Sequence, residues 1–131
     1  MSARLNRVCA TALGTVSLAA FGGDLTTRDG AFTTAQAERG KAVYLEFCLS
    51  CHQVDFYEAK LPAWQSASVG ELFTALSTTM PSANPGGLSS GQYLDVLAYI
   101  FSITGSPAGD EELSLRNMDA IEIVAPAVQG P

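Results

Sequence analysis

The run Cys-Leu-Ser-Cys-His at residues 48–52 constrains this chain more than any other feature. Two thiols three positions apart, followed directly by an imidazole, form the attachment site of a c-type haem. In that chemistry Cys48 and Cys51 add to the haem vinyl groups as thioethers, and His52 is the expected proximal ligand of the iron. His52 is also the only histidine in the sequence. The motif therefore predicts a fold built around one covalent porphyrin.

Length and charge narrow the remaining possibilities. With 131 residues the chain has room for one domain, and a chain of this size buries a modest fraction of its surface. A porphyrin at the centre would supply much of the missing core. The chain carries 13 Asp and Glu against 7 Lys and Arg, without a basic cluster, so nucleic acid is not an expected partner.

The N-terminus has the pattern of a general (Sec-type) secretion signal. Arg4 and Arg7 precede an apolar, small-residue run at 8–21, and residues 1–22 are predicted to be a cleaved signal peptide. The run is shorter than the roughly 20 residues that cross a bilayer as a helix, so a membrane tether is not expected. A buried N-terminal helix or an uncleaved anchor is the alternative. The mature protein would be periplasmic and anionic.

Cysteine usage agrees with export. Cys9 lies within the predicted signal, and Cys48 and Cys51 would be consumed by the haem, so no thiol remains for a disulfide. Because c-type haem is attached outside the cytoplasm, the signal and the motif support each other. A thiol–disulfide oxidoreductase would lack its usual βαβ setting and would leave His52 unexplained. A zinc site would need more ligands than these residues readily provide.

Three segments between residues 33 and 104 are predicted to be helices, and each opens with a capping box. The paired positions are Thr33 with Gln36, Ser68 with Glu71, and Ser89 with Gln92. The first helix is expected to cover about 34–50 and to lead into the haem motif. The second should end before Met80, and the third should stop at Gly105. No period-2 strand pattern competes in this region, so the domain is predicted to be all-α.

The ligand on the other face of the iron decides the chemistry of such a site. With no second histidine, the candidates are Met80 and Met118. Pro81 disfavours helical geometry at Met80 and favours an extended conformation there, and the turn-forming residues at 80–87 predict a tight loop against the porphyrin. Met80 is therefore the predicted sixth ligand, with the filling of a core gap as the alternative. The apolar pocket is expected to come from Phe47, Leu72, Leu76, Leu94 and Leu97.

In these features the chain resembles a class I cytochrome c. The resemblance is carried by the motif at 48–52, by Met80-Pro81, and by the closing helix around 93–100, and it covers about 34–104. It implies the cytochrome c fold, with three main helices wrapped around one covalent haem. The first and last helices would cross near Gly40, Tyr44, Leu97 and Tyr99. The stretch at 72–89 is also similar to small bacterial cytochromes associated with quinoprotein (PQQ-dependent) dehydrogenases.

The same resemblance assigns roles to two residues that follow the motif. In the family a proline carbonyl often accepts the proton-bearing nitrogen of the proximal imidazole, and Pro62 lies at a suitable position in this sequence. Its alternative role is to turn the loop. Trp64, the only tryptophan, would pack on the haem edge and donate its indole N–H to a propionate, or else belong to the ordinary core.

The expected organisation has four parts. They are the signal peptide at 1–22, an N-terminal linker at 23–33, a cytochrome c domain at 34–105, and a C-terminal extension at 106–131. In the extension, Ile121 and Ile123 alternate with polar or smaller residues and predict a short extended segment, which forms an arm around the helices. A disordered tail is the alternative.

The function implied by the resemblance is one-electron transfer by a carrier that is not itself an enzyme. Its partners would be a periplasmic dehydrogenase, a terminal oxidase or another cytochrome, and their contacts would be transient. Two alternatives remain. The protein could be the cytochrome subunit of a PQQ-dependent dehydrogenase complex, or a haem sensor or enzyme in which Met80 leaves the iron.

Overall fold

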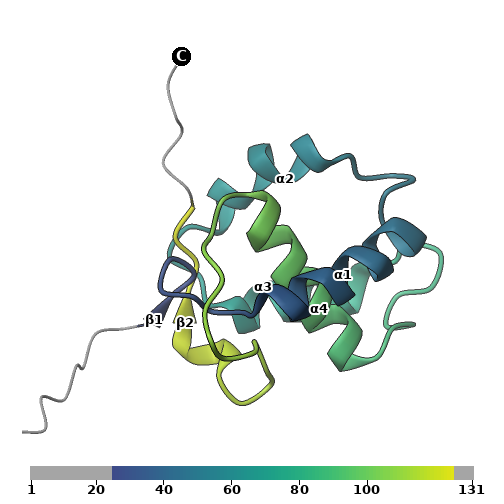
Figure 1. Cartoon of the computed structure of the whole chain (residues 1–131). Helices are drawn as coiled ribbons and strands as arrows, with labels where there is room; N and C mark the ends of the chain where they lie inside the picture. Colours follow the sequence, from purple (N-terminus) through teal and green to yellow (C-terminus); the bar gives the residue numbers. More distant parts are fainter. Residues whose placement is uncertain (1–24, 126–131) are drawn as a thin grey trace, which may run out of the picture.

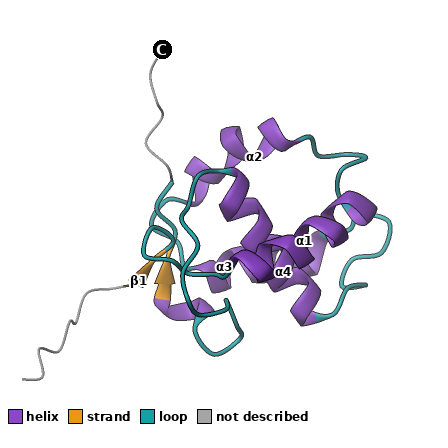
Figure 2. Cartoon of the chain, viewed as in Figure 1, coloured by secondary structure: helices purple, strands orange, loops and turns teal. Residues whose placement is uncertain are grey.

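The computed structural model describes residues 25–125, and this part of the chain is mostly helical (Figures 1 and 2). Its four α-helices are α1 (Thr34–Phe47), α2 (Val54–Lys60), α3 (Val69–Thr79) and α4 (Ser90–Ile103). Two short 3₁₀ helices, η1 (Leu61–Trp64) and η2 (Met118–Ala120), complete the helical content. The predicted all-α class is confirmed at this level. The predicted signal peptide, Cys9 included, lies outside the described residues.

Two of the three predicted capping boxes form in full. The Ser68 hydroxyl accepts from the Glu71 N–H at 3.1 Å while the Glu71 carboxylate accepts from the Ser68 N–H at 2.8 Å, and Ser89 and Gln92 make the equivalent pair. Each box satisfies two main-chain donors that the helix itself leaves free. These reciprocal bonds fix the first turns of α3 and α4, which hold both ends of the loop that contains Met80.

The box predicted at the start of α1 forms only in half. Thr33 accepts from the Gln36 N–H at 3.1 Å, as predicted, but the Gln36 side chain does not return to Thr33. Instead it is 2% exposed and bonds both main-chain groups of Leu113, with its Nε2 donating at 2.8 Å and its Oε1 accepting at 2.8 Å. A buried amide that satisfies two buried main-chain groups is more stabilising than a second bond at an exposed cap.

The helices α1 and α4 lie side by side and form the centre of the fold (Figure 1). They approach most closely at Gly40, where any Cβ would overlap the main-chain carbonyl of Asp95. Next along the interface, the ring of Tyr44 packs against Tyr99 with centroids 5.1 Å apart. The crossing therefore involves the residues that the resemblance had indicated, and glycine is required there by space rather than by backbone conformation.

The core extends beyond the predicted domain in both directions. Ala31 and Phe32, which precede α1, are 4% and 1% exposed, and they share one apolar cluster with Leu113, Ile121 and Ile123 from the other end of the chain. The folded unit therefore includes residues 25–33, which we had expected to be a linker. The C-terminal segment as far as residue 125 packs on the helices as an arm, and not as a disordered tail.

The two ends of the described chain meet in a small parallel sheet. Strand β1 (Leu25–Thr26) pairs with β2 (Ile121–Glu122), with Leu25 opposite Ile121. The arm then reaches the start of α3, where the Ile123 N–H donates to the Ala67 carbonyl at 2.8 Å. These bonds place the arm against the same helix that leads to Met80.

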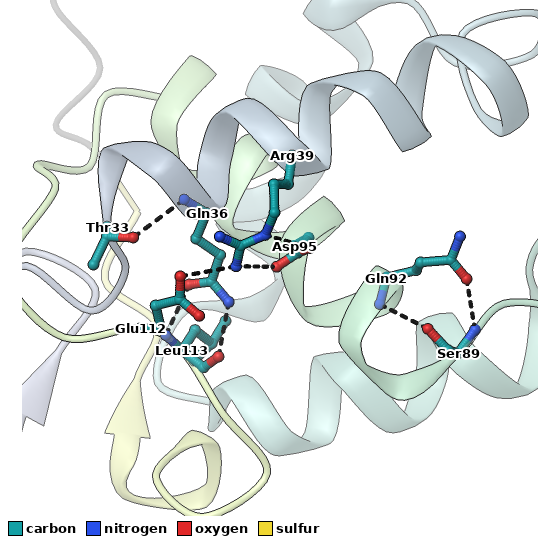
Figure 3. A network of polar contacts seen from close by, with 8 residues as sticks. All are labelled: Thr33, Gln36, Arg39, Ser89, Gln92, Asp95, Glu112 and Leu113. Atoms are coloured by element: carbon teal, nitrogen blue, oxygen red, sulfur yellow. Dashed lines mark hydrogen bonds and ion pairs between the residues drawn. The ribbon is translucent and has the colours of Figure 1, made fainter.

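A polar network beside the Gln36–Leu113 bonds also fastens the arm to α1 and α4 (Figure 3). Arg39 on α1 contacts Asp95 on α4 at 3.1 Å and Glu112 on the arm at 2.8 Å. Its hydrogen bonds with Asp95 and Glu112 raise the pKa of the Arg39 guanidinium above its ordinary value. Because Arg39 and Glu112 are about half exposed, this network contributes less to stability than the buried Gln36 pair.

We expect Gln36→Leu to destabilise the protein by about 3 kcal/mol, because it leaves the buried N–H and carbonyl of Leu113 without partners. Gln92→Leu is the matched control, since it removes only the return bond of an exposed capping box and should cost about 1 kcal/mol or less. Urea unfolding of both variants measures the difference. Equal losses would show that the Gln36 bonds do not anchor the arm.

The sequence did not predict α2 or η1, which lie between the haem motif and α3. The N-cap of α2, Gln53, makes no side-chain capping bond, and the helix buries none of its residues. Neither a cap nor an apolar periodicity therefore marks it. The first helix also ends earlier than expected, at Phe47, and residues 48–51 form a turn.

Within residues 25–125, no helix has both the length and the apolar character needed to span a membrane.

Candidate functional site

A cavity of about 270 Å³ lies among α2, η1, α3 and α4, and residues from all four elements form its wall. His52 and Met80 both line it, although 27 other residues separate them in the chain. Trp64 of η1 lines it as well. The structure thus brings three of the six predicted site residues to one cavity.

His52 ends a compact turn that is fastened to α1. The main-chain N–H groups of Cys51 and His52 both donate to the Cys48 carbonyl, at 3.1 and 2.9 Å. The hydroxyl of Tyr44, which is fully buried, donates to the His52 carbonyl, and burial raises the pKa of this tyrosine. The turn therefore holds the backbone of His52 at a fixed point beside the cavity.

The imidazole ring itself has an unpaired nitrogen. Nδ1 of His52 is buried and has no hydrogen-bond partner in the described part of the chain. The ring packs instead on Phe56 and Tyr57, with centroids 4.4 and 5.9 Å away. A buried polar atom without a partner is uncommon in proteins and often marks a functional position.

The structure does not contain the hydrogen bond that the resemblance implied between the Pro62 carbonyl and His52. Its carbonyl accepts from the Gln65 N–H at 3.2 Å, whereas Nδ1 of His52 has no partner. The 3₁₀ turn of η1 uses this carbonyl for its own closure, so Pro62 is placed as a turn residue. Pro62 also does not line the cavity, in contrast to its neighbours Leu61 and Ala63.

Both cysteines of the motif are free thiols, and they differ in burial. Cys48 is half-buried and packs on the cluster of Tyr44, Val96 and Ile100, and burial raises the pKa of its thiol. Cys51 is exposed. Because Ile100 belongs to the cavity wall too, Cys48 lies close behind the cavity, while Cys51 lies at the surface.

Met80 is the C-cap of α3, and its backbone is extended, with φ −124° and ψ 156°, as predicted from the following proline. Its N–H donates to the Leu76 carbonyl at 2.9 Å, which closes the last turn of the helix. Beyond it, Asn84 and Gly87 donate to the carbonyls of Pro81 and Asn84, at 2.9 and 3.0 Å. These successive turns form the predicted tight loop.

The apolar wall agrees in part with the prediction. Leu72, Leu76 and Leu97 line the cavity. Phe47 does not, because it follows the exposed face of α1 and is 40% exposed. Leu94 is buried, but it belongs to the core cluster rather than to the wall. In the same way, Met118 packs against the core and does not line the cavity.

Sequence reasoning missed the contribution of α2, which supplies Phe56, Tyr57 and Lys60 to the wall. Burial raises the pKa of Tyr57 well above its ordinary value. Lys60 adds a positive charge and lies 6.0 Å from the centre of the Phe56 ring. The position of this short helix directly after the motif is the signal that could have indicated its role.

The donor groups are the imidazole of His52 and the thioether of Met80, whose residues line the cavity, and the thiols of Cys48 and Cys51, which do not line it. Among residues 25–125, no group of three or more His, Cys, Asp or Glu side chains is arranged to hold a metal ion directly. Comparisons with protein-family models, curated proteins and solved structures gave no match. An imidazole and a thioether that face one apolar cavity are suited to ligate an iron held within a planar organic group.

Proposed function

We propose that this protein is a one-electron carrier of the class I cytochrome c type, with one covalent c-type haem ligated by His52 and Met80. The observation that carries the proposal is that both residues line the same cavity. The fold thus brings an imidazole-bearing and a thioether-bearing residue, separated by 27 other residues in the chain, to one largely apolar wall. Cys48 and Cys51 would provide the two thioether bonds.

Three further features support a haem at this position. The wall is largely apolar, the thiols are not joined to each other, and the buried Nδ1 atom of His52 has no hydrogen-bond partner in the described part of the chain. A haem bound here would supply reversible one-electron oxidation and reduction of its iron. The chain would contribute the imidazole of His52, on a turn that Tyr44 fastens to α1, and the thioether of Met80 on a tight loop, within a largely apolar wall.

The size of the cavity requires that its wall open when a haem binds. About 270 Å³ is slightly below the roughly 300–1,000 Å³ typical of pockets for small ligands, and a porphyrin is a large group. We infer that exposed side chains of the wall, including Phe56 at 36% exposed, move apart when the haem is attached. Lys60, which also lines the cavity, would offset the charge of a haem propionate.

The proposed location is the periplasm, reached through the signal peptide at 1–22. The acidic chain would dock with partners that carry basic patches, and such encounters should weaken as salt is added. A dehydrogenase would be the electron donor, and a terminal oxidase or another cytochrome the acceptor. Membership in a PQQ-dependent dehydrogenase complex is the narrower form of the same proposal.

Expression of the full chain in a bacterium that attaches c-type haem tests the proposal. We expect the exported protein to have the mass of the polypeptide plus one haem, and its oxidised spectrum to show the charge-transfer band of methionine bound to ferric iron. A mass without haem would contradict the proposal. Rapid binding of carbon monoxide by the reduced protein would favour a sensor with a labile Met80 over a carrier.

A further inference from the structure

Tyr93 lies in the first turn of α4 and contacts both ends of the loop that contains Met80. Its side chain is 3% exposed. The hydroxyl donates to the main-chain carbonyl of Met80 at 2.7 Å and accepts from the N–H of Leu88 at 3.4 Å, a longer contact. One hydroxyl therefore joins the first and last residues of the segment 80–88.

The ring that carries this hydroxyl is fixed on two sides. The capping box of Ser89 and Gln92 sets the backbone of the turn from which Tyr93 projects, and the Tyr93 N–H donates to the Ser89 carbonyl at 3.1 Å. Phe73 on α3 packs edge-on against the ring, with centroids 6.2 Å apart and an angle of 85° between the planes. The hydroxyl is therefore held in place before Met80 binds anything.

We propose that Tyr93 is a positioning residue that closes the 80–88 loop and keeps the Met80 thioether in the cavity. The proposal rests on the function proposed above, with Met80 as the iron ligand. Tyr93 does not line the cavity, so it would act through the backbone of Met80 and not on the iron or the porphyrin.

The physical argument concerns competition for the iron. Met80 leaves the iron more readily when its loop moves, and movement of the loop breaks the bond between the Tyr93 hydroxyl and the Met80 carbonyl. That bond connects α3 to α4, so it opposes displacement of the thioether by any external ligand. Without the hydroxyl, the loop keeps its turns at Asn84 and Gly87 but loses the connection between its ends.

The test compares Tyr93→Phe with Tyr99→Phe in the haem-loaded full chain. Phe keeps the ring packing on Phe73, so the variant removes only the hydroxyl. Tyr99 lies on the same helix, and its hydroxyl makes no hydrogen bond to residues 25–125, which makes it the matched control. The probe is imidazole, which replaces Met80 on ferric iron and thereby removes the methionine charge-transfer band.

For Tyr93→Phe we expect the imidazole dissociation constant to fall about three- to tenfold, as the loss of one hydrogen bond predicts. Tyr99→Phe should match the wild type. Amide hydrogen exchange at Leu88 should also be faster in Tyr93→Phe alone, and this readout does not depend on imidazole. Equal imidazole binding and equal exchange in the two variants would overturn the role of Tyr93.

The outcome for the wild type separates the two proposals. If its charge-transfer band is present and Tyr93→Phe behaves like the control, the positioning role fails while the electron-carrier function stands. If the wild type has haem but no such band, Met80 is not the ligand, and both proposals fail together.

Discussion

Replacing both Cys48 and Cys51 by alanine should abolish covalent haem attachment, so that the exported protein has the mass of the polypeptide alone. The physical reason is that each thioether requires one thiol, and the double variant leaves the haem motif with neither. Each single variant should keep at most one bond and give a lower yield of haem-loaded protein. Mass spectrometry of the purified protein measures the result directly.

Cys9→Ala is the control for this experiment. Cys9 lies in the predicted signal peptide, so its loss should leave haem content unchanged and should not alter the mass of the mature protein.

The stability of the double variant gives a second outcome that can be measured. Without the porphyrin, the apolar wall of the cavity, which includes Leu72, Leu76 and Leu97, has no bound group to pack against. A group that binds only the folded state stabilises that state, so its loss lowers stability. We therefore expect a lower unfolding midpoint. Full haem retention by the double variant would refute attachment through the motif.

The helical part of the fold was predictable because its signals are local. A capping box needs two side chains three residues apart, and both Ser68 and Ser89 act as predicted. The extended backbone of Met80 likewise follows from its covalent neighbour, Pro81. In such cases the residues that decide the conformation are adjacent in the sequence.

The features that the sequence did not predict correctly depend instead on contacts between segments that are far apart in the chain. Gln36 has the sequence pattern of a capping residue, but its amide bonds Leu113, which is 77 residues away. The burial of Phe32 and Ile123 in one core has no local signal either, and it moved the boundaries of the folded unit outward. Local propensity cannot indicate which distant main-chain groups will need a partner.

In the candidate site, too, the features with local signals were predicted and the others were missed. Its motif residues and Met80 were identified from spacing and neighbours, whereas α2 and its wall residues Phe56 and Tyr57 were not. Pro62 was assigned by analogy, and in the structure its carbonyl closes a turn of η1.

Met80→Ala should remove the methionine charge-transfer band of the oxidised protein and lower its reduction potential by on the order of 0.2 V, because axial ligands set haem potentials over about 0.8 V. The vacated position should also let carbon monoxide bind the reduced protein rapidly. Absorption spectroscopy and redox titration measure both effects. The haem should stay attached, since neither thioether is altered.

Met118→Ala is the matched control, because it removes the other candidate thioether. Met118 packs against the core, so its loss should lower stability by about 1–2 kcal/mol for a partly buried methionine while the band and the potential remain. Loss of the band in Met118→Ala and its retention in Met80→Ala would move the ligand to the arm. Because Met118 lies in η2 and does not line the cavity, that result would require a different fold around the haem, and the proposed site would be wrong.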